Sequence, residues 1–167
     1  MKIWRLTFVL CGCFWLFVAV GVMSLAHAEP ITYTPAQSLE IAKHGTLAVR
    51  LAECAQLGQQ AKQPNNVLQA QADGFNRESD LFLAALEKGN LTKEAGNKIP
   101  IIWGMLLSDY HTSLEFIKGE LWYSMKEQAR KDYTEGANPV QAWKDYEKDL
   151  TNKAAILYSD KNCELLK

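Results

Sequence analysis

Three side chains that could carry out nucleophilic catalysis share one helical pattern. Ser108, His111 and Glu115 are separated by three and four residues, so a continuous helix would place a hydroxyl, an imidazole and a carboxylate on one face. The sequence, however, contains neither a G-x-S-x-G turn nor a glycine-rich anion loop that would supply oxyanion donors. We therefore interpret these residues as a solvated helix face and predict no catalytic residue. A hydrolase built on Ser108 and His111 is kept as the third hypothesis for function.

His44 is the other candidate ligand for a metal or a cofactor. It precedes Gly45, where we expect a helix to end, and only Glu40, one turn earlier, could join it on that helix. The paired E-x-x-H motifs of di-iron bundles and the C-x-x-C-H motif of c-type haem are absent from the sequence. His111 and the methionines of its own predicted helix cannot bracket one haem iron. We predict no metal and no cofactor.

Two cysteines, Cys54 and Cys163, follow the apolar N-terminal segment. An even pair in an exported chain predicts one disulfide, which would close a loop of about 110 residues and contribute about 4–5 kcal/mol in the chain-entropy model. An intermolecular bridge and two free thiols are the alternatives. Neither cysteine has a C-x-x-C partner or a histidine at ligand spacing, so we interpret the pair as structural.

The first 28 residues have the pattern of an export signal. Lys2 and Arg5 form a positive start, the run that follows carries no charge, and Ala26-His27-Ala28 offers a cleavage site. We expect residues 1–28 to be a signal peptide and residues 29–167 to be one domain that is periplasmic or secreted. Because about 20 uncharged residues could also span a bilayer, the alternative is an uncleaved anchor with the domain outside the cytoplasm.

The charge of the predicted mature domain excludes one class of partner. The whole chain has 18 basic and 19 acidic residues, and removal of Lys2 and Arg5 leaves 16 basic residues and a net charge of −3. Nucleic-acid-binding proteins normally show a clustered excess of Lys and Arg, so we predict no nucleic-acid partner. Hydrophobic residues make up 48% of the chain, which also argues against a disordered protein.

The hydrophobic periodicity is helical along almost the whole predicted domain. Apolar residues recur at intervals of three and four, and no segment alternates with period two for long enough to form a strand. These patterns predict an all-α fold, a small antiparallel bundle of about four helices with a long, kinked third helix. The expected helices span residues 35–62 with a break near Gly45, 67–88, 101–134 after a kink or restart at Pro100, and a last helix through Val140 and Leu157.

The predicted disulfide constrains this bundle. In an up-down-up-down arrangement the first and last helices are antiparallel, so Cys163 would lie beside the start of the first helix. Cys54 is about 27 Å further along a straight helix from Ala36, far beyond the ~7 Å Cα separation that a disulfide allows. The first helix must break at Gly45, the tail 159–162 must fold back, or the topology must differ. We expect a break together with a bent tail.

Aromatic residues give the main indication of a binding surface. Trp122 lies beside the polar stripe of its helix, next to Tyr123, which shares a side with Phe116. A long helix wrapped by two neighbours would bury all three, whereas exposed aromatic residues are favoured interface anchors. We predict Trp122, Tyr123 and Phe116 as partner-binding residues. Four other aromatic residues lie on inward stripes and are expected in the core: Trp103, Tyr110, Trp143 and Tyr146.

We therefore favour a non-enzymatic exported helical protein that acts through protein–protein contacts. Its role would be that of an adaptor, envelope-complex subunit, inhibitor or chaperone, with another envelope or secreted protein as partner. The second hypothesis is a sensory or ligand-binding bundle that holds a small apolar molecule beside Pro100 and Gly104. A membrane is a partner only if the N-terminal segment stays uncleaved.

Overall fold

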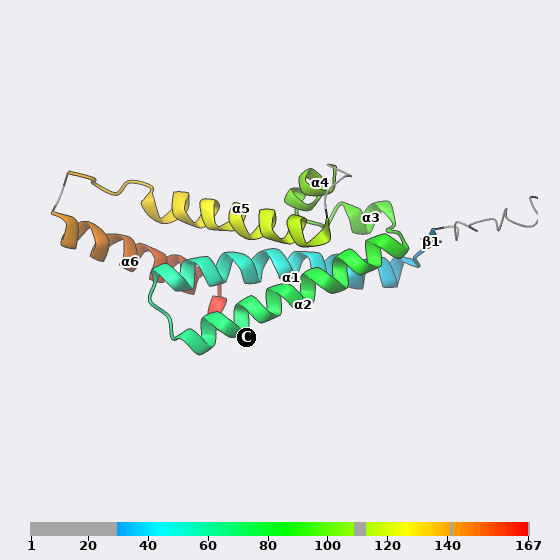
Figure 1. Cartoon of the computed structure of the whole chain (residues 1–167), viewed down its shortest axis with the longest axis horizontal. Helices are drawn as coiled ribbons and strands as arrows, with labels where there is room; N and C mark the ends of the chain where they lie inside the picture. Colours follow the sequence, from blue (N-terminus) through cyan, green and yellow to red (C-terminus); the bar gives the residue numbers. More distant parts are fainter. Residues whose placement is uncertain (1–29, 109–112, 141, 167) are drawn as a thin grey trace, which may run out of the picture.

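The computed structural model describes residues 30–108, 113–140 and 142–166, most of which are helical (Figure 1). The all-α prediction is therefore confirmed, whereas the predicted signal peptide lies outside the described residues. Within these residues, no helix is long and apolar enough to cross a membrane. The helices are α1 (Pro35–Gln60), α2 (Asn65–Lys88), α3 (Lys93–Gly96), α4 (Ile101–Leu107), α5 (Leu114–Thr134), α6 (Trp143–Asp160) and the 3₁₀ helix η1 (Cys163–Leu165).

Consecutive long helices run in opposite directions (Figure 1). α1 lies at the centre and contacts α2, α5 and α6. α5 and α6 form a second hairpin whose connecting end projects beyond the C-terminal end of α1, at the left of the view. Because of this shift, α6 packs along only one half of α1.

α1 begins as predicted but does not break at Gly45. Thr34 Oγ1 accepts the backbone N–H of Gln37 at 3.3 Å, and Gln37 Oε1 accepts the backbone N–H of Thr34 at 3.0 Å, which forms a capping box. Gly45 lies inside the helix, and a Cβ there would lie 2.9 Å from Cε2 of Phe82 in α2. Its carbonyl accepts a hydrogen bond from Trp103 Nε1 at 2.8 Å. The predicted break is wrong because this glycine serves close packing between helices.

The prediction of one long third helix is wrong, because the structure has two separate helices there. α4 ends at Leu107, and the hydroxyl of the next residue, Ser108, donates to the carbonyl of Met105 at 2.7 Å. α5 starts afresh after Ser113, whose Oγ accepts the backbone N–H of Phe116 at 3.3 Å. Short hydroxyl side chains favour helix ends over helix interiors, so two segments that share one apolar period form separate helices.

A pair of two-residue strands ties the start of the described chain to the end of α2. β1 (Ile31–Thr32) and β2 (Gly89–Asn90) are parallel, and a Cβ at Gly89 would lie 2.1 Å from the carbonyl oxygen of Ile31. Only glycine permits this approach of the two backbones. The hydroxyl of Tyr33 then donates to the carbonyl of Ala85 at 2.8 Å. These contacts fix Tyr33 against the last turns of α2.

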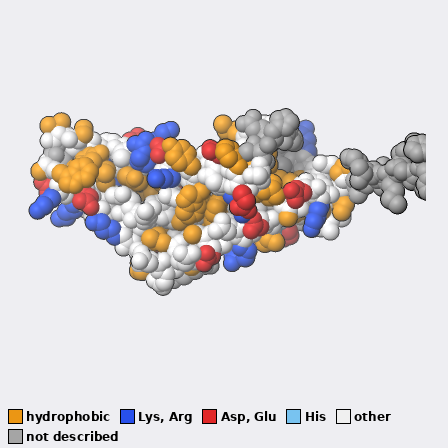
Figure 2. All heavy atoms as spheres, in the orientation of Figure 1, with side chains coloured by type: hydrophobic (Ala, Val, Ile, Leu, Met, Phe, Trp, Pro, Cys, Tyr) orange, Lys and Arg blue, Asp and Glu red, His pale blue; other side chains and the backbone are white. Residues whose placement is uncertain are grey.

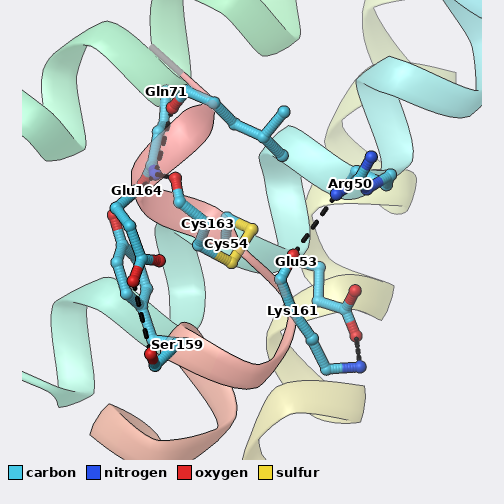
Figure 3. The surroundings of a disulfide bond; sticks show 10 residues. Arg50, Glu53, Cys54, Gln71, Ser159, Lys161, Cys163 and Glu164 are labelled. Carbon is cyan, nitrogen blue, oxygen red and sulfur yellow. Dashed lines mark hydrogen bonds and ion pairs between the residues drawn. A yellow bond between two sulfur atoms is a disulfide. The ribbon is translucent and has the colours of Figure 1, made fainter.

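The predicted disulfide is present. Cys54 in α1 and Cys163 in η1 are joined, with Cα atoms 5.4 Å apart. The chain turns back at Asn162, which has a left-handed φ of 54°, so the tail is bent as expected. Lys161 forms an ion pair of 2.9 Å with Glu53 beside the bridge (Figure 3). The shift of α6 along α1, rather than a break in α1, brings the two cysteines together.

The core has two parts that follow each other along α1. Fully buried Phe82, Trp103 and Leu121 centre the larger part, and the rings of Phe82 and Trp103 lie 4.8 Å apart. The smaller part surrounds the disulfide. There the buried amide of Gln71 in α2 donates to Tyr158 Oη at 2.9 Å and to the carbonyl of Cys163 at 3.1 Å. The end of α6 is therefore held by a covalent bond and by a buried polar contact.

Candidate functional site

The three predicted partner-binding residues do not share one surface. Phe116 and Tyr123 are 54% and 57% exposed and lie on the outward side of α5. Trp122 is half-buried, and its ring stacks on Phe75 of α2 at a centroid distance of 5.0 Å. Trp122 thus joins α5 to α2, whereas Phe116 and Tyr123 form a small outward pair.

The first turns of α6 carry another exposed aromatic surface. Trp143 is 71% exposed and its ring lies 6.0 Å from that of Tyr146, which is half-buried. We call Trp143, Tyr146 and Leu150 the α6 tip. Hydrophobic side chains gather at this end of the molecule, at the left of Figure 2. The expectation that Trp143 lies in the core is wrong, because the projecting end of α6 reaches beyond α1.

A groove of about 1270 Å³ lies along α1 and α2, toward the opposite end of the molecule from the α6 tip (Figure 1). We call it the α1/α2 groove. It is open to solvent, and Leu81 within it is 48% exposed. Most of its lining is apolar, supplied by Tyr33, Ala36, Leu39, Ile41, Ala42, Leu47, Leu81, Ala84 and Ala85.

The α1/α2 groove continues the seam that holds the C-terminal tail. Leu47 and Arg50 of the groove lie on the same face of α1 as Cys54, at spacings of three, four and seven residues. Arg50 also donates to the carbonyl of Lys161 at 3.3 Å, so it marks the point where the tail ends and the groove begins (Figure 3). The groove is therefore an extension of a helix–helix interface that the chain already uses.

The charged rim of the groove has an excess of cations. Among the described residues, Arg50, Lys88 and Lys98 line it without a carboxylate within ion-pair distance. Its other lysine, Lys43, is paired with Glu40, and its aspartate is paired with a lysine of α5. The unpaired cations favour an occupant with acidic flanks.

A buried carboxylate links α1 to α2 near this groove. Glu78 is almost fully buried, and its oxygens lie 2.6 Å from His44 Nδ1 and 2.9 Å from Arg77 Nε. Burial raises the carboxyl pKa, but the hydrogen bonds from His44 and Arg77 outweigh it, and the pKa of Glu78 lies below its ordinary value of 4.5. His44 thus belongs to an interhelical contact in mid-helix, whereas Glu40 is paired with Lys43.

The structure does not place the candidate catalytic residues on one helix. Ser108 follows α4 and Glu115 lies in the first turn of α5, where it pairs with Lys118 at 2.8 Å. His111 and Tyr110 lie outside the described residues. Gly104, beside which an apolar pocket was expected, is exposed, and a Cβ added there would meet open space. In the described part of the chain no three His, Cys, Asp or Glu residues cluster as metal ligands.

Sequence reasoning missed the groove for an identifiable reason. Its residues on α1 lie on the same face as Cys54, and a bundle whose helices have aligned ends would cover that face along its whole length. The amphipathic period of α1 shows which face is apolar, but it does not show how far a neighbour extends along it. The signal that could have revealed the groove was the disulfide, which does not fit a bundle whose helices have aligned ends and therefore indicates that part of α1 is left uncovered.

Comparison with known proteins adds no family to this description. No protein-family model matches the chain, and no match was found among curated proteins or among solved structures. The geometry of the α1/α2 groove and of the α6 tip is therefore the basis for inferring what the protein does.

Proposed function

We propose that this protein acts by binding other proteins, and that its α1/α2 groove receives the apolar face of an amphipathic helix. The observation that carries the proposal is the groove itself: an apolar channel along two helices, collinear with a seam in which the chain's own tail is bound. Amphipathic helices bind such grooves through residues spaced by three and four. The rim cations Arg50, Lys88 and Lys98 favour a helix with acidic flanks.

An exported location fits this proposal. A disulfide such as Cys54–Cys163 persists in oxidising compartments outside the cytoplasm. The N-terminal pattern of residues 1–28 has the features of an export signal. The partner would accordingly be another envelope or secreted protein.

The size of the groove supports a helix more than a small molecule. Small-molecule sites usually measure about 300–1,000 Å³, and the groove measures about 1270 Å³. An apolar ligand remains the second candidate function because most of the lining is hydrophobic. An anionic amphiphile would satisfy both that lining and the rim cations.

A photo-crosslinking experiment tests the proposal. A photoreactive amino acid is placed at Leu81 in the groove or at Phe116 on the outward side of α5, both of which are about half exposed. We expect a discrete protein adduct from Leu81 and none from Phe116 in intact cell envelopes. Adducts from Phe116 alone would assign binding to the outward pair of α5, and a lipid adduct at Leu81 would favour the ligand hypothesis.

A further inference from the structure

We propose that the helix received by the α1/α2 groove is α6 of a second copy of this chain. This inference rests on the proposed function and names its partner. It follows from the fact that one helix–helix interface, between α1 and α6, is used along only half of its length within a single copy.

The covered half of this interface shows how the two faces fit. Ala154 is fully buried and Tyr158 is 4% exposed on α6, while Cys54 and Leu57 are buried on α1. Gly58 of α1 allows a close contact, since a Cβ there would lie 3.0 Å from Cε2 of Tyr158. The apolar face of α6 and the groove face of α1 are therefore complementary where they meet.

The other halves of the same two faces are covered less completely, with Tyr146 and Leu150 of α6 half-buried. On α6 the stripe continues toward the N-terminus as Leu150, Tyr146 and Trp143, and the last of these is 71% exposed. On α1 the face continues from Leu47 to Ala36 and lines the groove. At about 1.5 Å per residue, the stripe spans ~10 Å and the groove face ~16 Å, so the α6 tip is short enough to lie in the groove.

The charges of the two surfaces are also complementary. The groove rim carries Arg50, Lys88 and Lys98 without carboxylate partners among the described residues. The first turns of α6 carry three acids and two lysines, and the acids are Asp145, Glu147 and Asp149. Only weak, exposed pairs of 3.4 Å hold Glu147 and Asp149 within the chain, so both can form new pairs in an assembly.

The positions of the two surfaces require the contact to form between copies. The α6 tip and the α1/α2 groove lie toward opposite ends of the molecule, so one copy cannot fill its own groove (Figure 1). Each copy instead presents its tip to the groove of another copy. Such contacts join either an antiparallel pair, in which each tip lies in the groove of the other copy, or larger rings and open chains of copies.

Analytical ultracentrifugation of two variants tests this inference. Trp143→Glu changes the tip and Leu81→Glu changes the groove, and both residues are exposed enough for the fold to tolerate the change. The purified, disulfide-intact protein should self-associate as its concentration rises. Each variant alone should associate at least tenfold more weakly, because the centre of an interface carries most of its affinity.

An equimolar mixture of the two variants is the decisive sample. Trp143→Glu keeps an intact groove and Leu81→Glu keeps an intact tip. We therefore expect 1:1 dimers of the two variants and nothing larger. Ile156→Glu, at a position of α6 that is 61% exposed and lies outside its apolar stripe, is the control and should associate like the unaltered protein. Tip-to-tip pairing would overturn the inference, because Leu81→Glu would then associate normally and the mixture would contain its homodimers but no complex of the two variants.

The result also separates this inference from the proposed function. If the protein stays monomeric at all concentrations while Leu81 still crosslinks to a different protein, self-association is wrong and helix binding in the groove stands. If the protein stays monomeric and Leu81 forms no protein adduct, both are wrong.

Discussion

The two halves of α6 have the same sequence pattern and opposite environments. Ala154 and Tyr158 in its second half are buried against α1 and the disulfide, whereas Trp143 in its first turn is 71% exposed. Both belong to one face with intervals of three and four residues. Amphipathic periodicity therefore identifies the apolar face of a helix but not the length over which a neighbouring helix covers it.

The disulfide explains why the two halves differ. It fixes the end of the chain to Cys54, well along α1, and so places the beginning of α6 beyond the end of α1. The same shift leaves the first half of α1 without a helix on its groove face. The exposed apolar surfaces of the α6 tip and of the α1/α2 groove therefore both follow from the disulfide.

Removal of the disulfide should have the largest effect on stability. Replacement of Cys54 and Cys163 by serine frees a loop with a sequence separation of 109 residues. We expect the free energy of unfolding to fall by about 4–5 kcal/mol, measured by urea denaturation. The wild-type protein under reducing conditions should lose a similar amount. A loss below about 1 kcal/mol would show that packing alone fixes the position of α6.

Truncation in the covered half of α6 should come next. Tyr158→Ala removes a ring that is 4% exposed and should cost about 3–5 kcal/mol. Tyr158→Phe is the control, since it keeps the ring and loses only the hydrogen bond from Gln71, at a cost of about 1 kcal/mol. Thermal unfolding measures both. Equal effects would mean that the ring contributes little and that the two halves of α6 do not differ.

The contribution of the buried Glu78 carboxylate to stability should depend on pH, unlike that of the exposed carboxylates of α6. Glu78→Gln should cost about 1–3 kcal/mol at neutral pH, because it weakens the contacts to His44 and Arg77. The folded pKa of Glu78 lies below 4.5, so its stabilisation is complete above pH 4.5 and is lost as the pH falls through the folded value.

Denaturation at a series of pH values measures the difference in unfolding free energy between Glu78→Gln and the wild type. This difference should disappear in acid. Glu147→Gln on the exposed half of α6 is the matched control and should stay within about 0.5 kcal/mol of the wild type. A pH-independent cost at Glu78 would show that the amide disturbs packing rather than removing a charge.

A substitution at Gly45 tests the continuity of α1 that makes the shift of α6 necessary. The new Cβ would lie 2.9 Å from Phe82, so Gly45→Ala should cost about 1 kcal/mol after its gain in helix propensity is included. Gly119→Ala, with open space around the new Cβ, should instead stabilise α5 by about 0.5–1 kcal/mol. Stabilisation by both changes in thermal unfolding would contradict the close contact at Gly45.

Local signals in the sequence predicted local structure well. The start of α1 at Pro35, the end of α2 near Gly89 and the Cys54–Cys163 pair all follow from neighbouring residues or from residue counts. Ser113 was an available signal that was overlooked, since a serine followed by Glu115 is typical of a helix start.

The candidate site depended on distances between helices, which no local pattern encodes. Gly45 has the sequence features of a helix end, and only the position of Phe82 shows that it is a packing contact. Trp143 was assigned to the wrong environment for the same reason, because the shift of α6 exposes it. The charge on the groove rim likewise depends on which lysines find carboxylates in space.

The smallest effect on stability is expected at Trp143, and it is the most direct test of the comparison. Trp143→Ala should change the free energy of unfolding by no more than about 0.5 kcal/mol, because the ring is 71% exposed in the first turn of α6. Trp122→Ala should cost about 2 kcal/mol, since its half-buried ring packs against Phe75. Chemical denaturation of both variants under the same conditions shows which of them loses more unfolding free energy. A larger loss at Trp143 would mean that its ring is covered in solution even in a single copy, in which case the first half of α6 has a partner within its own chain and is not free to bind a groove.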